Sequence, residues 1–272
     1  MIRLMTSDID ETLVDEVKNV PEKNRLAIAK AEKKGVKVML ATGRGPYELM
    51  DIPDQAEIVR DDRFIICCNG AIILRAEDHK IVDSLPLDFK YAKRVFNYAL
   101  EHNLEFFVYT LDKKYAINLD PIEKADVYTN DTNVELIEGD NIDFLKDELI
   151  LKAIIKNSNI DFLHSLEVDV ASITEYDVEI AYSSDLFMEI NAKGVDKGVA
   201  LQKLCDYYKI DIKDSLAIGD NYNDVAMIED AGIGVAVANA HLQVKEASDY
   251  VTKANNSQGA VAEAIEKFIL DN

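Results

Sequence analysis

Basic residues are scarce in this sequence. It holds 30 lysines and arginines against 51 aspartates and glutamates among 272 residues, which gives a formal net charge of −21 at pH 7. A surface of this charge repels nucleic acid and anionic membranes, so we expect neither as a partner. It also repels phosphate esters at long range, and a site for such a substrate would therefore need a cation and local basic groups.

Long apolar runs and paired cysteines are lacking as well. No stretch approaches the roughly 20 apolar residues that span a bilayer, and the first residues lead into Ser7 and Asp8 without the features of a signal peptide. The cysteines (Cys67, Cys68 and Cys205) are odd in number and lack metal-type spacing, which argues against a disulfide framework or a zinc site. We expect a soluble, cytoplasmic protein whose cysteines are small buried hydrophobes.

Proline and glycine are few, at 5 and 11 residues, whereas 48% of the chain is hydrophobic. Such a composition is typical of a folded chain with a sizeable core. The first and last thirds alternate strand and helix patterns, which predicts parallel strands with helices on both faces of the sheet, and an Asn-Gly pair at 69–70 predicts a hairpin. Strands are expected at 2–7, 36–41, 64–68, 71–74, 215–218 and 233–237. Helices are expected at 21–34, 196–208 and 258–270, and a further helix follows the motif after the strand at 215–218 and ends at residue 231.

The middle of the chain has another pattern. Several of its strands alternate apolar with polar residues, which favours an antiparallel sheet with one face solvated or covered by helices. Strands are expected at 106–109, 151–155, 171–174 and 179–182, and helices near 88–102, 120–128 and 159–168. We therefore predict an α/β fold, with a doubly wound, mostly parallel, Rossmann-like core formed by 1–84 and 186–272 and an inserted α+β domain at 85–185.

The first acidic motif is Asp8-Ile9-Asp10-Glu11-Thr12, which follows an apolar strand. Its two aspartates can face the same site if the backbone turns there. One carboxylate can attack phosphorus and form an acyl-phosphate, and the other can protonate the leaving oxygen and then deprotonate a water. The alternative for this string alone is an acidic loop that caps the next helix.

Two further motifs suit a phosphate group. The hydroxyl of Thr42 and the neighbouring backbone N–H groups are suitable donors, and Gly43 lets the backbone approach closely; the alternative is an ordinary strand-to-helix turn. Lys197 stands at a helix start, where the positive helix end favours anions. A lysine there indicates an anion or a carboxylate that needs neutralising, with a solvated surface lysine as the alternative.

The fourth motif is Gly219-Asp220-Asn221-Tyr222-Asn223-Asp224, again at a strand end. Ligands of open α/β sheets bind outside the carboxyl ends of the strands. Hard oxygen ligands on a tight turn suit Mg²⁺, which takes one or two carboxylates plus phosphate oxygen. Asp224 lies about one turn along the next helix, where it could orient a ligand or Lys197; an Asx-rich turn that caps the helix is the alternative.

The order of these motifs closely resembles that of the haloacid dehalogenase superfamily of phosphotransferases. It comprises D-x-D-x-T, a strand that ends in Thr-Gly, a Lys-Gly pair and G-D-x-x-N-D. The domain inserted between the second and third motifs resembles the subfamily IIB cap of the Cof-type phosphatases. Further matches are Asn69-Gly70-Ala71, Glu189-Ile190, the stretch 194–198 and the stretch 234–240.

The resemblance implies a role for each matching residue. Asp8 would be the nucleophile and Asp10 the general acid and base. Mg²⁺ would be held by the carboxylates of Asp8 and Asp220 and by the backbone carbonyl of Asp10. The phosphoryl group would be bound by Thr42, Gly43, Lys197 and Asn223, with Asp224 in a supporting position. The cap would close to exclude water and to select the leaving group.

Some positions leave alternatives open. Glu11 stands where the family most often has glycine, and it is expected to contact the substrate, to shape the turn or to face solvent. Asp196 precedes Lys197 where serine is common, and it can cap the helix. Arg44 is expected either to reach the substrate or to form a salt bridge within the core.

The sequence therefore predicts a Mg²⁺-dependent phosphomonoester hydrolase that works through an aspartyl-phosphate. Its substrate would be a small phosphorylated metabolite, either a sugar phosphate or a nucleotide-related phosphate. The alternatives are a sugar phosphomutase and a non-catalytic protein that binds phosphorylated metabolites. No pattern indicates the substrate itself, the cap residues that would select it, or the oligomeric state.

Overall fold

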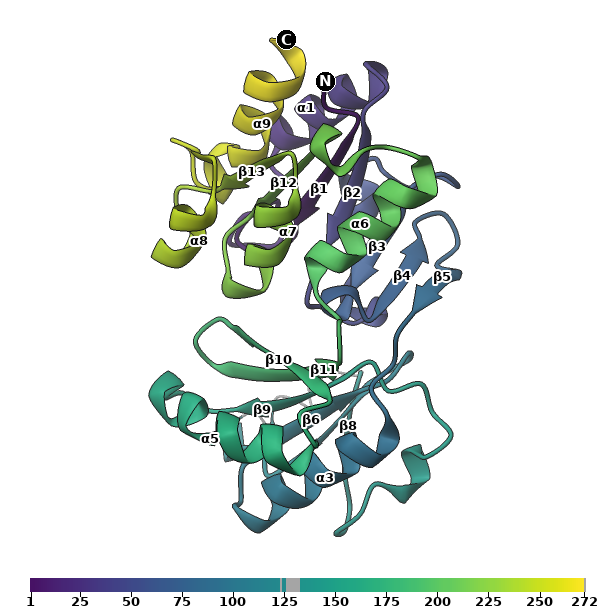
Figure 1. Cartoon of the computed structure of the whole chain (residues 1–272), viewed down its shortest axis with the longest axis vertical. Helices are drawn as coiled ribbons and strands as arrows, with labels where there is room; N and C mark the ends of the chain where they lie inside the picture. The colour runs from purple at the N-terminus through teal and green to yellow at the C-terminus, as the bar shows by residue number, and fades with distance from the viewer. Residues whose placement is uncertain (123, 126–132, 272) are drawn as a thin grey trace. The chain divides into compact units, whose positions relative to one another are not determined.

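The structure is a computed structural model, which describes residues 1–122, 124–125 and 133–271 (Figure 1). The chain forms two compact units. The first contains Met1–Arg44, Leu49–Ser84 and Asp196–Asn272, and the second contains Gly45–Glu48 and Leu85–Val195. No helix of the described ranges has the length and apolar character that crossing a membrane requires.

The first unit is built on an eight-stranded sheet with the order β14-β13-β12-β1-β2-β3-β4-β5. The strands are β1 (Leu4–Asp8), β2 (Lys37–Ala41), β3 (Phe64–Cys67), β4 (Ile72–Arg75), β5 (Ile81–Ser84), β12 (Ser215–Gly219), β13 (Ile233–Ala236) and β14 (Tyr250–Val251). Neighbours from β14 to β3 pair in parallel, whereas β4 and β5 pair antiparallel. The predicted mostly parallel sheet is confirmed, and so is the hairpin between β3 and β4.

Helices cover both faces of this sheet. They are α1 (Glu22–Lys33), α2 (Ile52–Gln55), α6 (Lys197–Tyr208), α7 (Val225–Asp230), α8 (Leu242–Ala247) and α9 (Ala260–Ile265). Met39 and Ala41 of β2 share a buried cluster with apolar residues of α6 and α7, which lie in front of the sheet in Figure 1. Alternate residues of a strand face opposite sides, so Val38 and Leu40 face the side on which α1 packs along β2.

Shorter helical turns complete the chain. They are η1 (Pro46–Glu48), η2 (Cys68–Gly70), η3 (Asp143–Leu145), η4 (Ile212–Asp214), η5 (Tyr222–Asp224), η6 (Asn256–Gln258) and a π-helical turn, η7 (Glu266–Leu270), that continues α9. The helix predicted at 258–270 is therefore present in two parts.

Three neighbouring parallel strands end at one edge of the first sheet. They are β12, β1 and β2, and the residues at or just after their ends are Asp220, Asp8 and Thr42. Since parallel strands have their carboxyl ends at the same edge, the fold brings motifs together that are far apart in the sequence.

The second unit is built on a six-stranded sheet with the order β10-β11-β9-β6-β7-β8. Its strands are β6 (Glu105–Tyr109), β7 (Lys114–Ile117), β8 (Val134–Leu136), β9 (Lys152–Lys156), β10 (Val178–Ser183) and β11 (Phe187–Ala192), and its long helices are α3 (Phe89–Glu101) and α5 (Ile160–Ile173). All pairs are antiparallel except β7 with β8. Phe106 and Val108 of β6 pack with Phe96 of α3 and Leu163 of α5.

The strand predicted at 171–174 is wrong. These residues continue and end α5, because Leu163, Leu166 and Val170 recur at helical spacing and are buried, and the hydroxyl of Thr174 donates to the carbonyl of Val170 at 2.7 Å. Much of the helix expected at 120–128 lies outside the described residues. The boundary expected at residue 185 falls before β11, a strand that pairs with β9 and β10 and so belongs to the second unit.

Candidate active site

Lys197 is fully buried, as the first residue of α6. Its Nζ donates to Oδ1 of Asp8 and to Oδ1 of Asp224, both at 2.6 Å. Burial opposes the charge of this lysine, but the carboxylates of Asp224 and Asp8 raise its pKa above the ordinary value. The alternative of a solvated surface lysine is therefore wrong. Asp196, one residue earlier, caps the helix by accepting from the backbone N–H of Val199 at 2.7 Å.

Asp224 is fully buried and is held at both carboxylate oxygens. Its Oδ1 accepts from Lys197, and its Oδ2 accepts from the backbone N–H groups of Asp220 at 2.9 Å and Asn221 at 3.0 Å. A Cβ at Gly219 would lie 2.5 Å from the Asp224 side chain, so only glycine allows this approach. The turn thus orients Asp224 toward Lys197, as its spacing in the sequence suggested.

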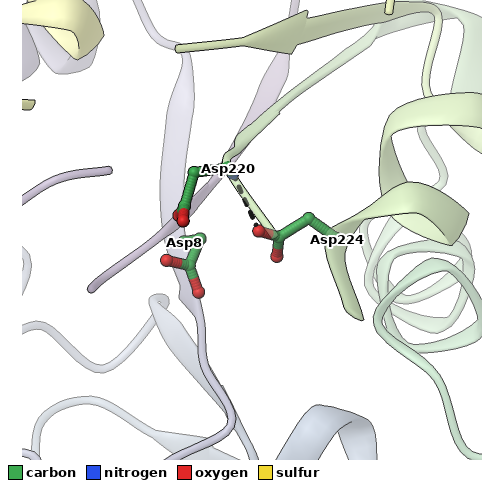
Figure 2. Close-up of side chains that lie close together, drawn as sticks. All are labelled: Asp8, Asp220 and Asp224. Carbon is green, nitrogen blue, oxygen red and sulfur yellow. Dashed lines mark hydrogen bonds between the residues drawn. The ribbon is translucent and has the colours of Figure 1, made fainter. Parts of the chain in front are cut away.

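Asp220 lies beside Asp8. Its Oδ1 accepts from the hydroxyl of Thr12 at 2.6 Å, so the threonine of the first motif orients the aspartate of the fourth. Figure 2 shows the carboxyl groups of Asp8 and Asp220 next to each other, with Asp224 bonded to the backbone of Asp220. Sequence reasoning gave no role to Thr12, although it stands inside the recognised string.

These three buried aspartates could hold a metal ion. Each offers a carboxylate oxygen, and these atoms all lie within 4.8 Å of one another. Burial raises the pKa of Asp8 to about 8 against the opposing effect of Lys197, and burial with the charge of Asp8 raises the pKa of Asp220 to about 9. When all three are ionised, three carboxylates against one ammonium leave an excess of negative charge that a divalent cation would offset, and oxygen donors are those that Mg²⁺ prefers.

Asp10 is held by two basic side chains. Arg44 donates from Nε to Oδ2 and from Nη2 to Oδ1, each at 2.7 Å, and Nζ of Lys18 lies 2.7 Å from Oδ1. Burial favours the neutral acid, but the hydrogen bonds and charges of Arg44 and Lys18 prevail and lower the pKa of Asp10 to about 2. The structure thus shows Arg44 in a salt bridge. Sequence reasoning missed Lys18, since the turn that returns it toward Asp10 carries no motif.

The remaining predicted residues also lie in the first unit. Thr42 is buried after β2, followed by Gly43, and its Oγ1 accepts from the backbone N–H of Arg44 at 3.1 Å. Asn223 lies in η5, beside Asp224. Glu11 is exposed with a φ of 55°, the left-handed conformation that glycine adopts most readily, which explains the glycine of the family pattern.

Glu189 belongs to the second unit. It is buried in β11, where it accepts from Nζ of Lys152 at 2.5 Å and from the hydroxyl of Ser183. The match at Glu189-Ile190 therefore lies in the six-stranded sheet and not at the edge of the first sheet, where the other predicted residues gather.

The chain resembles known proteins over almost its whole length. Residues 5–265 match the model of the family described as haloacid dehalogenase-like hydrolase. The chain is 31% identical over 272 residues to the 5-amino-6-(5-phospho-D-ribitylamino)uracil phosphatase YcsE of Bacillus subtilis, covering 99% of this chain and 96% of YcsE. It is 32% identical over 275 residues to the putative phosphatase YxeH of the same bacterium, covering 99% of each.

The solved structures agree with this grouping. The HAD subclass IIB sugar phosphatase BT4131 matches 98% of both chains with a TM-score of 0.82 and 21% identity, which shows that the fold is shared. Both the core and the inserted unit are included in this match. The chain therefore belongs to the haloacid dehalogenase-like hydrolases, and the relatives with which it shares 31% and 32% identity are named as phosphatases.

Proposed function

We propose that this enzyme is a Mg²⁺-dependent phosphomonoester hydrolase that forms a covalent aspartyl-phosphate on Asp8. The observation that carries the proposal is the buried carboxylate of Asp8, which lies 2.6 Å from Nζ of Lys197 and beside Asp220 at the carboxyl edge of the parallel sheet. A carboxylate so placed, with its charge balanced by a fixed ammonium, is suited to attack phosphorus.

The chemistry would be divided among the neighbouring side chains. Oδ of Asp8 attacks the phosphorus atom, and the ester oxygen leaves with a proton from the carboxyl of Asp10, which then takes a proton from the water that hydrolyses the intermediate. The carboxylates of Asp8 and Asp220 and the backbone carbonyl of Asp10 would hold Mg²⁺, which supplies positive charge to the phosphoryl oxygens when bound. Lys197 adds its own charge at the same place.

The phosphoryl group also needs neutral donors. We assign the hydroxyl of Thr42, the backbone at Gly43 and the amide of Asn223 to this task. Thr42 follows β2, which pairs with the strand that ends at Asp8, and Asn223 stands three residues after Asp220, beyond the end of β12. Asp224 supports them by fixing Lys197. Catalysis would then rest on positioning and on charge stabilisation of a loose phosphoryl transition state.

The substrate class we propose is a small phosphorylated metabolite, either a sugar phosphate or a nucleotide-related phosphate. The name of YcsE makes 5-amino-6-(5-phospho-D-ribitylamino)uracil the first compound to test, and the description of BT4131 as a sugar phosphatase makes sugar phosphates the second. A screen of phosphorylated metabolites with Mg²⁺ should show release of free phosphate, with Asp8→Asn as the blank. Isomerised sugar phosphate in place of free phosphate would indicate a mutase and contradict the proposal.

Chelation of Mg²⁺ should abolish turnover, and added Mg²⁺ should raise the Tm more at high pH than at low pH. The reason is the raised pKa of Asp8, about 8, and of Asp220, about 9. The pKa of such a carboxyl is higher in the folded protein than in the unfolded chain. The metal-free protein therefore has its full stability below the unfolded pKa, and it loses stability as the pH rises through the folded pKa. Metal binding needs the deprotonated ligands, so the gain in Tm should grow between about pH 5 and pH 9.

Thermal unfolding with chelator and with Mg²⁺, across this pH range, measures the effect. Asp220→Asn should reduce the gain, whereas Asp206→Asn, on the exposed face of α6, should leave it unchanged. A gain that is independent of pH, or one that is equal in Asp220→Asn and the wild type, would contradict the assignment of the metal site.

Replacing Lys18 by glutamine should shift the basic limb of the profile of kcat/KM against pH upward. The first step needs Asp10 as the acid that protonates the leaving oxygen. Lys18 lowers the pKa of Asp10, so its removal raises that pKa, and the acid form of Asp10 persists to higher pH. The pair is partly exposed, so we expect a shift of roughly 0.2 to 0.7 pH unit. Lys33→Gln, an exposed position at the end of α1, is the control, and equal profiles for the two variants would exclude the role of Lys18.

A further inference from the structure

The turn between β3 and β4 has an unusual backbone. Cys68, Asn69 and Gly70 follow one another with φ angles of 48°, 58° and 107°, so three successive residues adopt the left-handed conformation. This conformation is unfavourable for a residue such as Cys68, and it persists only where surrounding contacts hold it. The contacts of the turn therefore indicate what it does.

The backbone of the turn holds the loop that follows β2. The N–H of Asn69 donates to the carbonyl of Thr42 at 3.0 Å, and the N–H of Cys68 donates to the carbonyl of Arg44 at 2.9 Å. Two hydrogen bonds thus fix the loop that contains the Thr42 hydroxyl and the Gly43 backbone.

The turn also touches the other two segments that are expected to contact phosphate. A Cβ at Gly70 would lie 2.6 Å from the carbonyl oxygen of Asp196, so glycine allows the turn to pack against the start of α6, where Lys197 begins the helix. Oδ1 of Asn69 accepts from Nδ2 of Asn223 at 3.0 Å. One short turn therefore meets the loop of Thr42, the helix of Lys197 and the side chain of Asn223.

We propose that Asn69 is a positioning residue for the phosphoryl group, acting through Asn223 and the Thr42 loop. By accepting one N–H of the Asn223 amide, the side chain of Asn69 fixes the plane of that amide and leaves its second N–H to a phosphoryl oxygen. The left-handed backbone supports this, because asparagine and glycine tolerate such a φ and only asparagine adds the acceptor. The inference rests on the proposed phosphatase function.

Asn69→Gly is the informative variant, since glycine keeps the left-handed backbone and its N–H while the acceptor is lost. One neutral hydrogen bond is lost, so kcat/KM for an aryl phosphate should fall about three- to tenfold, and the inhibition constant of orthophosphate should rise by a similar factor. A merely structural role would lower the amount of folded, active enzyme and thus the apparent kcat, while the KM and the inhibition constant stay unchanged.

A double-mutant cycle with Asn223→Ala tests the route of the effect. If Asn69 acts through Asn223, the side-chain loss at 69 should add little to the loss already caused by Asn223→Ala. Asn103→Gly is the matched control, because Asn103 is another left-handed asparagine (φ 51°), in the second unit after α3, and its replacement should leave all constants unchanged.

Two results would overturn the inference in an enzyme whose wild type hydrolyses the ester. One is a KM and an orthophosphate inhibition constant in Asn69→Gly that equal those of the wild type, and the other is full additivity of Asn69→Gly with Asn223→Ala. A wild type without turnover would instead overturn the proposed function. Calorimetric titration of orthophosphate with Mg²⁺ into the wild type and Asn69→Gly would then decide about Asn69 by itself, with equal affinities counting against it.

Discussion

Asp8→Asn should lower the turnover of an aryl phosphate by more than about 10³-fold, because the loss of a nucleophile leaves only binding and charge stabilisation to act. The amide keeps the size of the carboxylate, but it cannot form the acyl-phosphate. Phosphate release at saturating Mg²⁺ measures the loss. In the wild type, mass spectrometry of acid-quenched enzyme should find the phosphate on the peptide that contains Asp8.

The stability of this variant separates a chemical defect from a folding defect. Asp8 is buried, and burial penalises its charge, so replacing it by a neutral amide should raise the Tm of the chelated protein. Asp206→Asn removes one carboxylate from an exposed position of α6 and should leave turnover and Tm unchanged. Turnover near the wild-type level in Asp8→Asn would refute the covalent mechanism.

Lys197→Met should lower the free energy of unfolding by about 3 kcal/mol or more at neutral pH, as expected when one member of a buried ion-pair network is removed. Asp8 and Asp224 would lose an ammonium that lies 2.6 Å from each, while methionine fills a similar volume. Both carboxylates raise the pKa of Lys197, so the contribution of the ammonium is complete below its unfolded pKa of about 10.4 and is lost only as the pH rises through the folded pKa.

The deficit of Lys197→Met should shrink as the pH falls toward about 5, because the carboxyls left behind take up protons. Urea denaturation at both pH values measures it. Lys203→Met, on the same helix, removes a partly exposed lysine that lies 2.6 Å from Asp83, and it should cost less than about 1 kcal/mol. Equal stabilities for the two variants would show that the buried lysine is not the centre of this network.

Much of the core could be predicted because its signals are local. Each strand expected in the first unit is present to within two residues, since an apolar run bounded by a turn residue needs no distant partner to be recognised. The same pattern placed Asp8, Thr42 and Asp220 at strand ends, and the parallel pairing then brought them to one edge. Lys197 was expected from its unfavourable position at a helix start, and its two carboxylate partners explain that position.

Other features depend on contacts that a sequence does not encode locally. The pair of Lys18 with Asp10 requires the chain to turn back, and the bond of Asn69 with Asn223 joins residues 154 positions apart. Ile173 and Thr174 are β-branched, which favours a strand at 171–174, but burial of the preceding helical face extended α5 through Ile173. Tertiary packing decided each of these cases.

The order of the strands sets the time at which this site can be completed during synthesis. β1 emerges first, yet its neighbour β12 follows more than 200 residues later, and Asp220 stands just beyond β12. Apart from Gly45–Glu48, the second unit is one continuous stretch of chain, Leu85–Val195, and it is synthesised in full before β12. A ribosome must therefore deliver the whole second unit before Asp8 can meet Lys197 and Asp220, so this cluster forms only after the second unit has been synthesised.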